Sequence, residues 1–143
     1  MCPRRARLTP EEVNEYLDSK PGWIVLTTIG PDGFPHSVPL GYFRHDESVF
    51  LGMRDNTTKV RNVEANPKVS LMVESGSTMG EIKGVMIQGN GRVHRAPEKV
   101  LEIMRLGAAK RGVAEADLPS EARPGSVYVE VVPVRTISWD YGR

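Results

Sequence analysis

The amino-acid sequence predicts a mainly β domain of the α+β class, in which about six antiparallel strands form a closed or half-open barrel with short flanking helices. Runs of β-branched and aromatic residues, bounded by turn residues, recur along the 143 residues. The first three runs are joined by turns too short for a helix, which indicates antiparallel hairpins. Helices separate only the later runs, so the regular alternation of a doubly wound parallel sheet is missing. We expect one domain over residues 1–143, with residues 1–7 mobile.

The first element expected is a short helix. Thr9, Pro10 and Glu12 combine an N-cap threonine, a proline at the first helical position and a glutamate three residues after the cap. Apolar residues at 13, 16 and 17 share one face, so this helix should pack against the body of the domain.

The strands expected from the pattern span residues 23–29, 34–43, 48–53, 69–74, 82–94 and 126–139, with further helices at about 57–65 and 97–110. Pro35 and Pro39 interrupt the second strand and place it at an edge or a bulge, because proline donates no ladder hydrogen bond. Glycines at 84, 89 and 91 indicate bulges or close backbone approach, which would bend the fifth strand as barrel closure requires.

The junction between the third strand and the next helix is the main candidate for a binding site. Arg54 ends the strand, and residues 55–57 are of N-cap types, so the helix would present unpaired amides. These amides, the hydroxyls of Thr57 and Thr58, and the ammonium of Lys59 would together attract phosphate, and Asn62 could face the same ligand. An ordinary capped helix with solvated charges explains the same residues equally well.

Composition and motifs exclude several classes of function. Lys and Arg number 19 against 18 Asp and Glu, and aromatic residues make up 6%, so nucleic-acid binding is not expected. No apolar run reaches transmembrane length, and no signal-peptide pattern is present, so no membrane partner is expected. Cys2 is the only cysteine, which favours a cytoplasmic protein. Three scattered histidines and no paired-ligand motif argue against a metal site.

Four segments together carry a resemblance to a known family. They are Asp32-Gly33-Phe34-Pro35-His36-Ser37-Val38-Pro39, Lys59-Val60-Arg61-Asn62, Asn66-Pro67-Lys68-Val69-Ser70-Leu71 and Gly84-Val85-Met86-Ile87-Gln88-Gly89. In this order they resemble the split β-barrel flavin-binding family related to pyridoxamine 5′-phosphate oxidase, and in particular its small flavin/deazaflavin oxidoreductases from actinobacteria. The resemblance spans most of residues 8–139.

The resemblance implies a homodimer of six-stranded antiparallel split β-barrels, with FMN or coenzyme F-420, a deazaflavin, bound at the subunit interface. By position, it implies cofactor contacts from His36, Ser37, Val38, Pro39, Met53, Arg54, Thr57, Thr58, Lys59, Asn62, Gln88 and Trp139. Trp139 could come from either subunit, or could equally be a C-terminal hydrophobic anchor. The chain departs from its relatives at Gly41, where many carry a bulky aromatic residue, and it lacks the C-terminal substrate-anchoring segment of the oxidase that names the family.

The activity implied is hydride transfer between the bound cofactor and a small organic substrate. The cofactor carries that chemistry, so no catalytic residue is assigned, and His36 is only a candidate proton donor. The alternative is a split barrel that binds flavin or haem without turnover.

Overall fold

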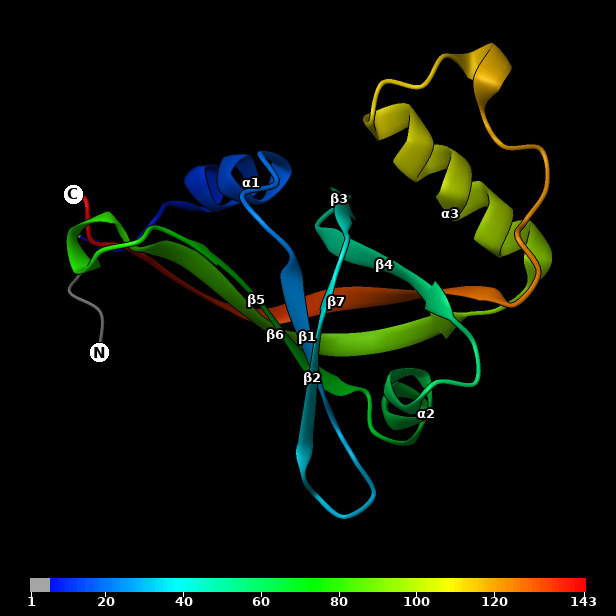
Figure 1. Ribbon diagram of the computed structural model, residues 1–143, viewed down its shortest axis with the longest axis horizontal. Helices are drawn as coiled ribbons and strands as arrows, with labels where there is room; N and C mark the ends of the chain where they lie inside the picture. The colour runs from blue at the N-terminus through cyan, green and yellow to red at the C-terminus, as the bar shows by residue number, and fades with distance from the viewer. Residues whose placement is uncertain (1–5) are drawn as a thin grey trace.

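The computed structural model describes residues 6–143, and Cys2 lies outside the described residues. Within them the chain forms three α-helices, two single 3₁₀ turns and seven strands (Figure 1). The elements are α1 (Pro10–Asp18), β1 (Ile24–Ile29), β2 (Pro35–Leu40), β3 (Phe43–His45), β4 (Ser48–Arg54), α2 (Thr58–Ala65), β5 (Lys68–Ser75), η2 (Met79–Glu81), β6 (Lys83–His94), α3 (Pro97–Lys110), η3 (Glu115–Asp117) and β7 (Ser126–Asp140).

The strands form one antiparallel sheet in the order β2-β1-β5-β6-β7-β4-β3. Its two edge strands, β2 and β3, are consecutive in the chain and are joined only by Gly41 and Tyr42. The sheet therefore curls back on itself without closing, because no ladder joins its two edges. The mainly β, barrel-like α+β class predicted from the sequence is confirmed.

The expected number of six strands is wrong, because the strand expected at 34–43 already ends at Leu40 as β2, and a separate short strand, β3, begins at Phe43. The break falls at Tyr42, whose backbone oxygen accepts a bond from the Lys20 ammonium. The Tyr42 hydroxyl donates to the Leu17 oxygen at 2.5 Å. Both groups are thus bonded to the end of α1 and the turn after it. Because Tyr42 is bonded toward α1, the chain leaves the β1–β2 ladder here and pairs with β4 instead.

The main core fills the inside of the curled sheet. Leu26, Leu51, Leu71, Val129 and Val131 are each 0% exposed. Since alternate residues of a strand face opposite sides, burial at 127, 129 and 131 confirms the single apolar face predicted for the last strand.

The helices cover different parts of the sheet. The predicted capping box of α1 is confirmed, with the Thr9 amide donating to the Glu12 carboxylate at 2.9 Å and the Glu12 amide donating to the Thr9 hydroxyl at 3.2 Å. In Figure 1, α3 lies above β4 and β7, and α2 lies below β6. Ile103 of α3 packs with Phe43 and Phe50 in a second, smaller core outside the barrel. No helix in the described part of the chain is long and apolar enough to cross a membrane.

The glycines of β6 have the structural roles that the sequence predicted. The ladder shifts register at Gln88 and Gly89, where the extra residue, Val134, lies in β7, and a Cβ at Gly89 would stand 2.5 Å from the Val132 oxygen. A Cβ at Gly91 would stand 2.8 Å from Val63, so the missing side chain lets α2 approach the strand. At Gly84 a Cβ would stand 2.5 Å from the ring of Trp139, which lies directly over this glycine.

Candidate functional site

The connection between β4 and α2 forms an open cradle of backbone amides. Asn56 takes a left-handed conformation with φ +59°, which turns the chain from the strand into the helix. Thr57 occupies the N-cap position, but its hydroxyl donates to the Arg54 oxygen at 3.0 Å and does not cap the helix. The amides of the first helical turn therefore have neither an intrahelical partner nor a side-chain cap. Thr58 is exposed and Lys59 half-buried beside them.

A single arginine holds this cradle in place from outside. Arg95 donates to both carboxylate oxygens of Asp55, at 2.7 and 3.0 Å, and to both oxygens of Glu64, at 3.0 and 2.9 Å. These hydrogen bonds lower the pKa of Asp55 and of Glu64, and they raise the pKa of Arg95. Because Asp55 lies before α2 and Glu64 in its last turn, the arginine ties both ends of the helix to one point.

Asn62 faces the interior of the barrel. Its side-chain amide donates to the Thr28 hydroxyl at 3.0 Å, and the two residues are 4% and 0% exposed. Thr28 pairs with His36 in the β1–β2 ladder. The bond thus connects the cradle helix to β1, and the neighbouring strand β2 carries the second group of predicted site residues.

That second group divides between the two faces of the edge strand β2. His36 and Val38 are half-buried, and they alternate with the exposed Ser37 and Pro39. The Ser37 hydroxyl is hydrogen-bonded to that of Thr27 at 2.8 Å. The buried Nδ1 atom of His36 has no hydrogen-bond partner within the described residues. Buried polar atoms are nearly always paired, so this unpaired nitrogen is an exception among the described side chains.

Two rows of side chains cross the outer face of the sheet. Strand register aligns a polar row of Ser37, Thr27, Ser70, Gln88 and Arg135 and, beside it, an apolar row of Pro39, Val25, Met72, Met86 and Ile137. In the polar row, Arg135 donates to the Gln88 side-chain oxygen at 3.1 Å. A shallow pocket of about 440 Å³ lies along the polar row. Gln88 is therefore placed on an open face, away from the barrel interior.

Trp139 lies far from the cradle. It pairs with Gly84 near the start of β6, whereas α2 contacts Gly91, seven residues further along. At about 3.3 Å per residue this separates the two points by about 23 Å along the strand. One protomer therefore brings together the cradle residues and β2, but not Trp139.

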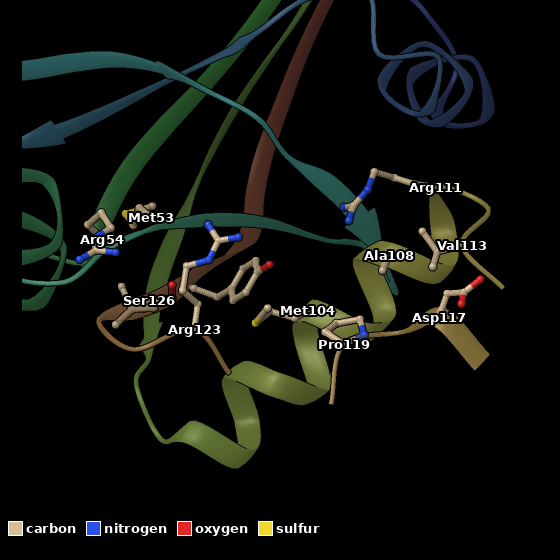
Figure 2. Close-up of a pocket in the computed structure, with 13 residues that line it drawn as sticks. Met53, Arg54, Met104, Ala108, Arg111, Val113, Asp117, Pro119, Arg123 and Ser126 are labelled. Carbon is tan, nitrogen blue, oxygen red and sulfur yellow. The ribbon is translucent and has the colours of Figure 1, made fainter. Parts of the chain in front are cut away.

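A second pocket, which the sequence did not reveal, lies outside the barrel between α3, β4, β7 and residues 113–126 (Figure 2). Its volume is about 560 Å³, and its lining includes Arg54, Arg111, Arg123, Tyr128 and Met104. Of the predicted residues, Arg54 and Met53 line it. The other two cations of this pocket are Arg111, at the end of α3, and Arg123, in the loop before β7. No sequence pattern indicates that these two residues lie close together.

No group of three or more His, Cys, Asp or Glu residues within 6–143 is arranged to hold a metal ion.

The chain was compared with protein families, with curated proteins and with solved structures. Residues 9–140 match the family described as pyridoxamine 5′-phosphate oxidase. Among curated proteins, none matches the chain significantly in sequence.

Several solved structures share the fold. The conserved hypothetical protein Rv2991 from Mycobacterium tuberculosis aligns over 99% of this chain and 90% of its own, with a TM-score of 0.83 and 23% identity. A protein described as an F420 reductase aligns over 85% and 94%, with a TM-score of 0.63 and 19% identity. The haem storage protein HutZ from Vibrio cholerae aligns over 96% and 99%, with a TM-score of 0.66 and 18% identity. At these identities the likeness shows a common fold.

Proposed function

The chain belongs to the pyridoxamine 5′-phosphate oxidase family, and from this membership we propose that it binds a phosphate-bearing flavin or deazaflavin and acts as an oxidoreductase. The observation that carries the proposal is the uncapped start of α2. Its free amides, the Thr58 hydroxyl and the Lys59 ammonium are the groups that bind phosphate at helix N-termini. The donor set therefore fits the phosphate of FMN or of coenzyme F-420.

The edge strand β2 is the proposed neighbour of the cofactor ring. Among the described strands β2 pairs with β1 alone, so its other edge has backbone groups free for a ligand. The bond from Asn62 to Thr28 holds the cradle helix beside this strand. We therefore propose that the phosphate lies at Thr57, Thr58 and Lys59, and the ring toward His36–Pro39.

When bound, the cofactor supplies the hydride-carrying atom, and the protein supplies position and electrostatics. Lys59 and the helix amides hold the phosphate, and this anchors the rest of the molecule. His36 presents its unpartnered Nδ1 as the candidate proton donor. The substrate proposed is a small organic molecule.

We further propose that two copies of the chain form a homodimer through the outer face of the sheet. The apolar row there is only partly covered, with Met72 38% and Ile137 39% exposed. A second copy would bury this row, and it would also bring its own Trp139 and Gln88 toward the first copy's site.

The direct test is the absorption spectrum of the purified protein, followed by titration with FMN and with coenzyme F-420. Lys59→Ala should weaken binding of the preferred cofactor by about 1–3 kcal/mol, the scale of a lost charged hydrogen bond. Lys99→Ala removes the same charge from α3 and should leave affinity unchanged. Binding of neither cofactor would refute the proposal, and equal affinity of the Lys59 variant and the native chain would refute the phosphate position.

The second candidate is binding of haem or flavin without turnover. His36 is the residue that suggests it, because its imidazole is half-buried on the edge strand β2 and imidazole is a common haem ligand. Haem titration with and without His36→Ala distinguishes the candidates, since only a haem protein ligated by His36 would lose its Soret shift in the variant.

A further inference from the structure

The pocket between α3, β4, β7 and residues 113–126, termed here the arginine pocket, contains an excess of positive charge. Three guanidinium groups line it, from Arg54, Arg111 and Arg123, against one carboxylate, from Asp117. None of these three arginine side chains makes a hydrogen bond or ion pair with another described residue. Elsewhere in the fold, Arg44, Arg95 and Arg135 all have side-chain partners. The arginine pocket therefore gathers guanidinium donors that the protein itself leaves free.

An aromatic side chain forms the floor of the pocket. The Tyr128 ring lies over Gly52, where a Cβ would stand 3.1 Å from the ring edge. Burial raises the pKa of Tyr128, while the charges of Arg111 and Arg123 act in the opposite direction, so both cations lie near this hydroxyl. The hydroxyl has no partner among the described side chains. Figure 2 shows Met104, Val113 and Pro119 around the same space, which gives the pocket apolar walls.

The apolar lining, the tyrosine ring and the free guanidinium groups together indicate which class of ligand the pocket would bind. Apolar walls and a tyrosine ring favour a flat or hydrophobic body, whereas free guanidinium groups favour a carboxylate, phosphate or sulfonate. The volume of about 560 Å³ lies within the range of small-molecule sites.

We propose that the arginine pocket binds an organic anion with an apolar or aromatic body, held at its charged end by Arg111 and Arg123. The pocket adjoins the cradle, because the Asp55 amide donates to the Gly125 oxygen at 2.9 Å and Arg54 precedes it. The arginine pocket lies on the outside of β4 and β7, however. Binding of an anion there therefore does not depend on a flavin bound at α2.

Two probes that differ only in charge test this proposal. 8-Anilinonaphthalene-1-sulfonate has an aromatic body and one sulfonate, and N-phenyl-1-naphthylamine has the same body without the charge. Fluorescence titration of the full chain should give tighter binding of the sulfonate. In the double variant R111Q/R123Q, affinity for the sulfonate should fall at least about tenfold, the scale of one lost charged hydrogen bond, while affinity for the neutral probe stays unchanged. Arg54 is left intact because it is also a predicted cofactor contact.

Matched variants keep the test specific. R92Q/K99Q removes the same net charge outside the pocket lining and should bind both probes as the native chain does. Val113→Trp places a ring in the pocket and should weaken both probes, with circular dichroism showing that the variant is folded. Unchanged sulfonate affinity in R111Q/R123Q, an equal loss in R92Q/K99Q, or unaffected probes in Val113→Trp would each overturn the proposal. FMN titration of R111Q/R123Q should match the native chain, so failure here is distinct from failure of the proposed cofactor site.

Discussion

The buried bond between Asn62 and Thr28 provides a sharp test of how the cradle helix is held. Asn62→Ala removes the donor and leaves a hydroxyl that is 0% exposed without its partner. A lost buried hydrogen bond with one unsatisfied partner costs about 1–3 kcal/mol. Thr28→Val should cost a similar amount, because it leaves the Asn62 amide unsatisfied. Replacing both groups by apolar ones, in Asn62→Leu with Thr28→Val, should return the free energy of unfolding to within about 1 kcal/mol of the native value.

Urea unfolding of the native chain, Asn62→Leu, Thr28→Val and the double variant Asn62→Leu/Thr28→Val, followed by circular dichroism, forms a double-mutant cycle, with Asn62→Ala measured beside it. Because the two single losses of about 1–3 kcal/mol are nearly absent in the double variant, the cycle should give a coupling energy of at least about 1 kcal/mol. Cofactor titration of the double variant should then give near-native affinity, since the helix is again held by packing. The reasoning fails if Asn62→Ala leaves stability unchanged and weakens cofactor binding, because Asn62 would then be a direct ligand contact, as its position in the family pattern implied.

Three further predictions concern the hydrogen bonds of Arg95 and the proposed dimer interface. Arg95→Ala should weaken cofactor binding without removing a ligand contact, because Asp55 and Glu64 lose the group that holds both ends of α2; isothermal titration against Lys99→Ala checks this. Since the folded-state pKa of both carboxyls is lowered, their contribution to stability is present above the ordinary carboxyl pKa and is lost as pH falls through the folded-state pKa. Acid titration of unfolding should thus show a smaller loss in Arg95→Ala than in the native chain. Ile137→Asp should convert the proposed dimer to a monomer in analytical ultracentrifugation, because it places a charge in the apolar row; a native chain that sediments as a monomer would contradict the interface.

Much of the fold could be predicted because local chemistry and global structure agree. Thr9 and Glu12 form a capping box that needs no tertiary context, and β7 alternates cleanly since one face is buried. Proline in β2 correctly indicated an edge strand, because a missing amide donor is a property of the residue itself. The glycines of β6 likewise marked places where backbone or a ring comes close.

The remaining features depend on contacts between distant segments. The break at Tyr42 arises from bonds to Leu17 and Lys20, which no strand pattern encodes. Asn62 has a polar side chain on a polar helix, and only the position of Thr28 makes it a buried residue. The arginine pocket unites residues from four separate segments, so its charge is invisible in a chain with 19 basic and 18 acidic residues.

The position of Trp139 separates this ring from the cofactor site proposed in the same protomer. Within one protomer this ring lies over Gly84, about 23 Å along β6 from the point where α2 contacts Gly91. A cofactor ring along β2 would lie level with Gln88 at Ser37 and with Met86 at Pro39, but β1, β5 and β6 would still separate it from the strand of Trp139. If Trp139 contacts the cofactor at all, it must therefore reach the site of the partner, across the same face that carries the apolar row. Ile137 lies two residues before it in β7, so loss of the dimer in Ile137→Asp should also remove any effect of Trp139→Ala on cofactor affinity.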